Sequence, residues 1–378
     1  MNMAVKFSDR DSEGKRGSLQ QGHGSGGGGK LLRPCGLIRF SPAKSGLVHT
    51  GGRARARTPV VESPRLTPKK RVSSFLWTVL LIQALACGRK SLESSSRAVR
   101  LDFDGNGKAD FAVFRPSTGV WHFAPPGPSD EPHSITLGGV GSIPVPGDYD
   151  GDGKWQCAVF REVDGTWLIR RASGEVREVP FGQKGDIPVP ADYDGDGKTD
   201  VAVFRPATGT WYALLSSGSG MTTASFGAQG DLPLPRDYDG DGKDDLAVFR
   251  PATGFWYIGS ALSPGVARSF QFGRAGDQPV PADFDGDGIV DPAVFRPEDG
   301  SWHVQPSSRN ARWKPMAFGS PGDIVLAERF GGQRTPELAA FRSSTGTWFV
   351  LDPVSGKTSS FPFGERGDWP VGVSPALR

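Results

Sequence analysis

The sequence predicts an all-β fold, a six-bladed β-propeller whose blades are four-stranded antiparallel sheets. Three observations predict it. The phrase DYDGDGKTD at residues 192–200 recurs at offsets of 44 to 46 residues. Strand-like and turn-like pieces alternate within each repeat, and 53 Gly and 32 Pro among 378 residues are typical of many turns. A period of about 45 residues with four strands matches one propeller blade.

The beginning of the chain differs from the rest in charge and pattern. Residues 1–100 carry 19 basic and 5 acidic side chains, whereas residues 101–378 carry 25 basic and 36 acidic ones. Residues 1–71 are Gly-rich and without apolar periodicity, so we expect a disordered region there. An acidic domain has no nucleic-acid footprint, and we expect no nucleic-acid partner.

Residues 72–87 have the pattern of a secretory signal peptide. A basic KKR triplet precedes an apolar run that ends in ALAC. Because such a signal opens a chain, we expect the true start near Val60, Val61 or Val72. ALAC resembles the lipobox of bacterial lipoproteins, although Ala84 stands where Leu is usual; the alternative is an ordinary signal cut near Ala86. We therefore expect an exported protein, held at the cell surface or outer membrane by a lipid on Cys87, or secreted. Residues 88–100 are a linker.

The repeat that contains residues 192–200 shows the four strands in order. Residues 187–193 lead into the acidic loop, and residues 201–205 (VAVFR) form an apolar run typical of a strand covered on both faces. A Pro- and Gly-marked turn precedes the strand at 210–215, and a Ser- and Gly-rich turn precedes the strand at 223–226.

Three short signatures recur with the strands. These are the Trp of the third strand, the Phe-Arg pair of the second and the Gly-Asp of the link to the next repeat. The Trp residues are Trp121, Trp167, Trp211, Trp256, Trp302 and Trp348, and the Arg residues are Arg115, Arg161, Arg205, Arg250, Arg296 and Arg342. Six sugar sites are one interpretation, but residues present in every repeat favour the packing of one blade on the next.

The acidic loop has the chemistry of a calcium site. Asp at positions 1, 3, 5 and 9 places carboxylates around one tight turn, and Gly at positions 4 and 6 lets the backbone turn. Hard oxygen ligands in this number suit calcium, with the backbone carbonyl of position 7 as a further ligand. Position 12 is Val in all five copies, which excludes an EF-hand. The alternative is a set of Asp-Gly turns without metal.

Five copies supply candidate ligands, and we expect about five calcium ions. The candidates are Asp102, Asp104, Asn106, Lys108 and Asp110; Asp148, Asp150, Asp152, Lys154 and Gln156; Asp192, Asp194, Asp196, Lys198 and Asp200; Asp237, Asp239, Asp241, Lys243 and Asp245; and Asp283, Asp285, Asp287, Ile289 and Asp291. Gln156 removes one charge from the second copy, which we expect to be the weakest. In a degenerate sixth copy of the loop, Glu328 and Glu337 are the only acidic residues of the pattern that remain, and we expect no metal there.

Residues 101–374 resemble the FG-GAP or VCBS-type repeats of bacterial surface proteins, which are related to the propeller of integrin α-subunits. The resemblance rests on DYDGDGKTDVAVFRP, the TGTWY turn and the FG…GDIPVP link. It implies a calcium-binding propeller.

Three classes of function compete. A non-catalytic binding or scaffold propeller is favoured, with an unidentified protein or glycan as ligand and a monomeric state. A lectin is the alternative, and a polysaccharide-degrading enzyme is the least favoured, because the three histidines of the domain show no catalytic pairing. Cys157 fills an apolar slot of the repeat and is predicted to be buried.

The two ends of the domain each carry part of one strand. GDWPVGVS at 367–374 resembles the link before the third acidic loop, whereas residues 97–103 enter the first loop without such a link. A closed ring avoids open sheet edges. We therefore expect residues 368–374 to lie beside residues 98–103 in the first blade.

Overall fold

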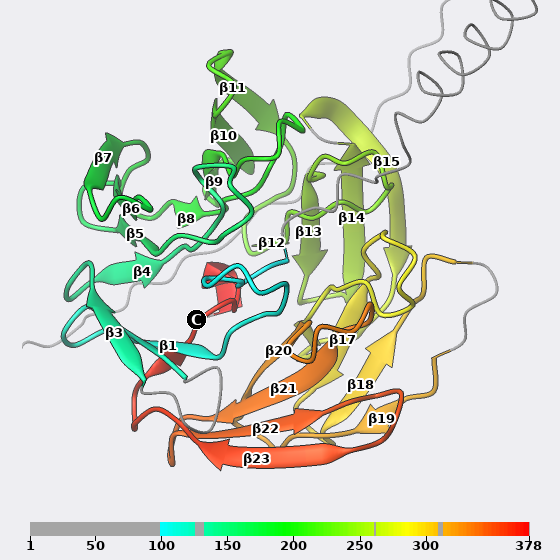
Figure 1. Cartoon of the computed structure of the whole chain (residues 1–378). Coiled ribbons are helices and arrows are strands. Elements are labelled where there is room, and N and C mark those ends of the chain that lie inside the picture. The colour runs from blue at the N-terminus through cyan, green and yellow to red at the C-terminus, as the bar shows by residue number, and fades with distance from the viewer. Residues whose placement is uncertain (1–98, 125–131, 261, 309–312, 378) are drawn as a thin grey trace, which may run out of the picture. The chain divides into compact units, whose positions relative to one another are not determined.

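Six four-stranded antiparallel sheets surround a common axis (Figure 1). The computed structural model describes residues 99–124, 132–260, 262–308 and 313–377. The predicted disordered region, the signal-like segment with Cys87 and most of the linker lie outside these residues. Over the described ranges the secondary structure is β-strand, apart from the short 3-10 helix η1 (Pro375–Leu377). The predicted six-bladed, all-β fold is confirmed.

The blades follow one another along the chain. Blade 1 is β24 (Trp369–Pro370), β1 (Ala112–Arg115), β2 (Val120–Phe123) and β3 (His133–Thr136); blade 2 is β4 (Ser142–Pro144), β5 (Ala158–Arg161), β6 (Thr166–Arg170) and β7 (Val176–Pro180); blade 3 is β8 (Ile187–Pro188), β9 (Val201–Arg205), β10 (Thr210–Leu215) and β11 (Gly220–Ser225). Blade 4 is β12 (Leu232–Pro233), β13 (Ala247–Arg250), β14 (Phe255–Ser260) and β15 (Ser263–Gln271); blade 5 is β16 (Gln278–Pro279), β17 (Ala293–Arg296), β18 (Ser301–Val304) and β19 (Met316–Ala317); blade 6 is β20 (Ile324–Glu328), β21 (Glu337–Arg342), β22 (Thr347–Leu351) and β23 (Thr358–Pro362).

The core lies between neighbouring blades. Phe160 of β5 is fully buried in one cluster with Val203 of β9, so the apolar second strands meet across the blade interface. This explains why VAVFR is apolar at successive positions instead of alternating. Cys157 is buried in such an interface, as predicted, and burial raises the pKa of its thiol to about 12.

The recurrent Trp and Arg residues hold the blades together. All six Trp side chains are buried, and Trp211 donates its indole N–H to the backbone oxygen of Phe226 at 2.7 Å. Arg205 makes two hydrogen bonds to Asp186, at 2.8 and 2.9 Å, which tie the second strand of its blade to the first. The buried indole of Trp211 lies in one cluster with Leu246 and Val248 of the next blade, so packing between blades is borne out for this Trp, whereas the contacts of Arg205 lie within its own blade.

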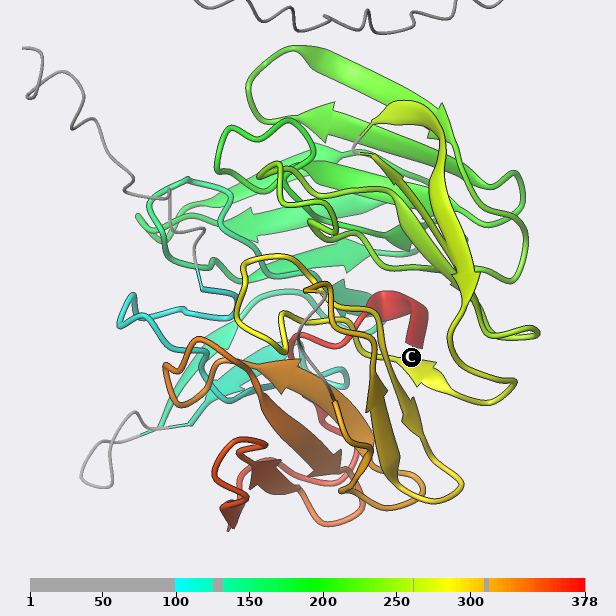
Figure 2. The same cartoon turned by 90° about the vertical axis from the view of Figure 1, so that its right-hand side faces the viewer.

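The C-terminal strand closes the ring. β24 pairs with β1 in the registers Val113↔Pro370 and Phe114↔Trp369, so the last strand of the chain completes the first blade. The strand that pairs with β24 is therefore β1, and not residues 98–103. Residues 98–103 still lie beside the C-terminal segment at one point, where Leu101 contacts Gly372. The backbone oxygen of Leu101 accepts from Asp110 N–H at 2.9 Å. In Figures 1 and 2, η1 lies near the middle of the blades.

Candidate metal centre

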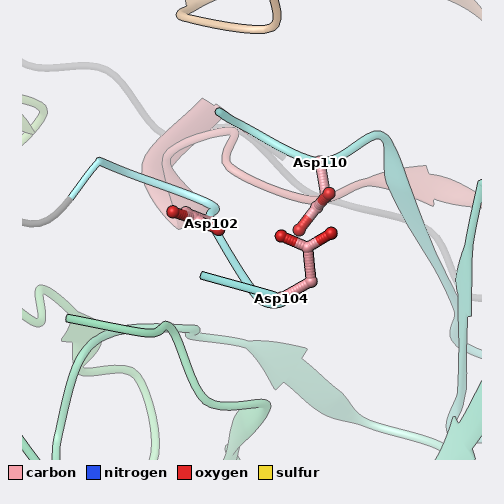
Figure 3. A group of neighbouring side chains, drawn as sticks. All are labelled: Asp102, Asp104 and Asp110. Carbon is pink, nitrogen blue, oxygen red and sulfur yellow. The ribbon is translucent and has the colours of Figure 1, made fainter. Parts of the chain in front are cut away.

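Three carboxylates converge in four of the five predicted loops. In each group the ligand atoms of positions 1, 3 and 9 lie within 4.8 Å of one another. The groups are Asp102, Asp104 and Asp110; Asp192, Asp194 and Asp200; Asp237, Asp239 and Asp245; and Asp283, Asp285 and Asp291. Figure 3 shows the first of them, with Asp104 and Asp110 facing each other and Asp102 on the same turn. Three carboxylates at this separation form an oxygen-rich cation site.

Backbone amides hold each carboxylate in place. In the third loop, Asp192 accepts from the N–H groups of Gly195 and Gly197 at 2.7 and 3.0 Å. Gly195 has a φ of 80°, a conformation that favours glycine. Asp200 immediately precedes β9, and its side chain accepts from Tyr193 N–H at 2.9 Å. The alternation of Asp and Gly thus folds the loop around its first carboxylate and aims the last one inward.

The carboxylates at position 9 are electrostatically strained. Burial is the largest cause that raises the pKa of Asp110 and of Asp200 to about 6 and that of Asp291 to about 7, and neighbouring carboxylates act in the same direction. In the same group as Asp200, Asp194 Oδ2 is buried without a hydrogen-bond partner. A divalent cation would satisfy this oxygen and relieve the repulsion. The residues present therefore fit calcium.

At position 5, two of the predicted ligands make hydrogen bonds to serine side chains. Asp196 and Asp287 lie outside the groups of converging carboxylates and accept hydrogen bonds from Ser216 and Ser307 at 2.9 and 2.8 Å. Sequence reasoning missed these two serines. The signal was present, because each follows the recurrent Trp of its blade by five residues. Asn106 likewise donates to Asp104 at 2.8 Å.

Each of the first five loops is joined by a backbone hydrogen bond to the loop before it around the axis. The backbone N–H at position 8 of one loop donates to the oxygen at position 1 of the loop before it. These bonds are Trp155 to Asp102 at 2.8 Å, Thr199 to Asp148 at 2.7 Å, Asp244 to Asp192 at 2.7 Å and Val290 to Asp237 at 2.9 Å, and Ala109 of the first loop reaches Arg329 of the sixth at 3.0 Å.

The side chain at position 7 covers the neighbouring loop. Lys154 lies against Gly105, where a Cβ would stand 2.6 Å from its Cε, and donates to Asp104 O at 2.8 Å. Lys198, Lys243 and Ile289 cover Gly151, Gly195 and Gly240 in the same way, and Lys108 of the first loop covers Gly332 of the sixth. A glycine at position 4 is therefore required for close approach as well as for the turn.

Residues of the second to fifth acidic loops and the beginning of the sixth line a cavity of about 1080 Å³. Its lining includes Arg100, Trp155 and Glu328, which also line a smaller cavity of about 110 Å³ next to the C-terminal segment. Arg100 lies 3.2 Å from Glu328 and 5.2 Å from the centre of the Trp155 ring. The acidic loops thus lie at the rim of the axial opening.

The second and sixth loops are built differently. Within the described ranges neither brings three His, Cys, Asp or Glu side chains together. Gln156 takes the place of the last Asp and accepts from Tyr149 N–H at 2.6 Å. In the sixth loop Glu328 pairs with Arg100, and Glu337 accepts from Gly331 N–H at 3.1 Å.

The chain is similar to several solved structures at low identity. A lectin from Agrocybe aegerita that recognises non-reducing terminal N-acetylglucosamine is 14% identical, with a TM-score of 0.49, over 72% of this chain and 84% of that chain. Virginiamycin B lyase from Staphylococcus aureus is 8% identical, with a TM-score of 0.44, over 71% and 88%. These values carry no argument about function.

The sequence comparisons are more specific. No curated protein sequence matches the chain. The FG-GAP-like repeat family matches residues 237–294, which include the fourth acidic loop and β13 to β16. The same phrase recurs around the ring, in blades of the same construction. The described part of this chain is therefore a six-bladed β-propeller that contains an FG-GAP-like repeat at residues 237–294.

Proposed function

We propose that this protein is a non-catalytic, calcium-binding propeller that presents a binding or scaffold surface for a protein or glycan outside the bacterial cell. The convergence of three carboxylates in four loops is the observation that carries the proposal. When bound, calcium would cross-link the beginning and the end of each loop. Positions 1, 3 and 9 would hold it, and the ring of loops would stiffen at the rim of the axial opening.

The histidines support a binding role over a catalytic one. His303 Nε2 lies 2.8 Å from Ser301 Oγ and 3.0 Å from Arg296, a pairing that resembles an activated serine. However, Tyr212 and Tyr257 occupy the same repeat position, and their hydroxyls accept from Arg205 and Arg250. His303 is therefore one more partner of the recurrent Arg, which is an architectural role.

A calcium titration of the full chain tests the proposal. We expect weak binding, with dissociation constants of roughly 10⁻⁴–10⁻³ M as in other extracellular modules. Asp194→Asn keeps the side-chain shape, removes one charge from the third loop and should remove one ion from the total. Magnesium, which demands a smaller octahedral shell, serves as the control cation. A calorimetric titration without calcium-dependent heat would refute the metal-binding function.

The proposed location follows from the metal and from the signal-like segment. Calcium sites this weak fill only where calcium is millimolar, which is outside the cell. Among the described residues, no helix is long and apolar enough to cross a membrane. We propose that the protein is exported and anchored through a lipid on Cys87, or secreted.

Mass spectrometry of the native N-terminus tests this location. We expect a mature chain that begins at Cys87 with a diacylglyceryl group. An unmodified N-terminus created by cleavage near Ala86 would indicate free secretion. A cytosolic chain that begins at Met1 would contradict export.

A further inference from the structure

We propose that the second loop, residues 148–156, binds no ion and is closed by Gln156 and Arg171 in place of calcium. The inference rests on the proposed function, and it lowers the expected number of ions from five to four. It follows from the hydrogen bonds of the Gln156 amide and from the surroundings of Asp150, which are independent observations.

The orientation of the Gln156 amide is fixed by the backbone. Its Oε1 accepts from Tyr149 N–H at 2.6 Å, and its Nε2 donates to Lys154 O at 2.8 Å. An amide N–H can only donate and a carbonyl can only accept. If the amide were rotated by 180°, its NH₂ group would face the Tyr149 N–H and its oxygen would face the Lys154 oxygen, so neither hydrogen bond could form. The NH₂ group therefore points to the carbonyl at position 7.

That carbonyl is the backbone ligand that a calcium ion in this loop would need. In the third loop the matching residue, Asp200, accepts from Tyr193 N–H at 2.9 Å and offers a carboxylate to the centre of the loop. Gln156 keeps the bond to the backbone and replaces the negative charge by N–H donors. Donors directed into the loop repel a cation, whereas they satisfy the same oxygens that a cation would bind.

The carboxylate of Asp150 lies near the guanidinium of Arg171. Its Oδ2 accepts from Ala172 N–H at 3.2 Å, and its Oδ1 lies 4.0 Å from Arg171 Nη1. In the third loop, Asp194 at the same position keeps a buried Oδ2 without a partner. The bond from Ala172 has a counterpart in the fifth loop, where Asp285 Oδ2 accepts from Ser308 N–H at 3.2 Å, so the guanidinium of Arg171 is what distinguishes Asp150.

The second loop nevertheless keeps its place in the ring. Trp155 N–H donates to Asp102 O at 2.8 Å, and Asp148 O accepts from Thr199 N–H at 2.7 Å. The first and third loops are thus linked through a member that needs no metal. The second loop therefore remains an ordered join between blades when calcium is scarce.

Hydrogen exchange measured by mass spectrometry, with calcium and with chelator, tests this inference in the unmodified full chain. Chelator should raise deuterium uptake at least several-fold in peptides that cover residues 192–200 and leave those that cover residues 148–156 within error. Equal sensitivity of the two loops would overturn the inference. Insensitivity of both would instead refute the proposed calcium binding, so the two failures are distinct.

A reciprocal pair of variants tests the role of Gln156 itself. Gln156→Asp should add one calcium ion to the total and make residues 148–156 sensitive to chelator. Asp200→Gln in the third loop should remove one ion and make residues 192–200 insensitive. Five ions bound by the unmodified protein, or an unchanged count in a folded Gln156→Asp variant, would contradict the inference.

Discussion

Removal of calcium by a chelator is expected to lower the melting temperature of the propeller by roughly 10–20 °C. A site filled at about ten times its dissociation constant stabilises the folded state by about 1.4 kcal/mol. Four independent sites give about 5–6 kcal/mol, and each kcal/mol shifts the melting temperature of a domain this large by about 2–4 °C. Differential scanning calorimetry in excess calcium and in chelator measures the shift.

The shift should depend on pH in a defined direction. The pKa of Asp200 is about 6 without metal, whereas the ordinary value is 3.8. Between these values the folded state binds more protons than the unfolded state, so this group destabilises the metal-free protein increasingly as the pH rises. Protons also compete with calcium at low pH. The gap between calcium and chelator melting temperatures should therefore be wider at about pH 7.5 than at about pH 5.

A single-site variant provides the matched control for chelation. Asp194→Asn empties one loop, so its melting temperature in calcium should fall by only about 3–6 °C. A melting curve that does not change on chelation would mean that the acidic loops are plain Asp-Gly turns. A variant that loses as much as full chelation does would mean that the sites are not independent.

Deletion of residues 367–378 is expected to unfold the whole propeller. The deletion removes β24 from β1 and takes the buried side chains of Val371 and Val373 out of the core that joins blades 6, 1 and 2. Burial of one such side chain contributes about 1.5–3 kcal/mol, and Arg115 also loses Asp368, to which it bonds at 2.8 Å. The total is comparable with the stability of a typical domain.

A chain that ends at Ser374 is the control for this deletion. It keeps β24 and both valines and loses only the segment of η1, so its circular dichroism and cooperative melt should resemble those of the full chain. A cooperative melt near the native temperature after deletion of residues 367–378 would contradict closure of the ring by β24.

The repeats determine much of the fold because each carries its own strands and turns. The apolar VAVFR run predicted a strand buried on both faces, and β9 and its equivalents are buried in this way. The pairing of β24 with β1 was harder to predict from the sequence. A strand of two residues, Trp369 and Pro370, has no periodicity to mark its partner, and its register depends on contacts with residues far away in the sequence.

The sequence predicted which residues form the acidic loops, but it predicted fewer of the contacts that these residues make. Asp at positions 1, 3 and 9 converges because local amides orient each carboxylate. The cover that Lys154 provides over Gly105 joins residues of different blades. Spacing within one repeat does not encode this contact. Gln156 marked a loss of charge in the sequence, but only the amide contacts indicate a replacement for the ion.

Anomalous diffraction from crystals grown in calcium is the most direct test of calcium binding by the acidic loops. We expect an anomalous peak within each group of three carboxylates, including that of Asp192, Asp194 and Asp200, and none in the loop of Gln156. Absence of a peak between Asp192 and Asp200 in calcium-saturated crystals would contradict it.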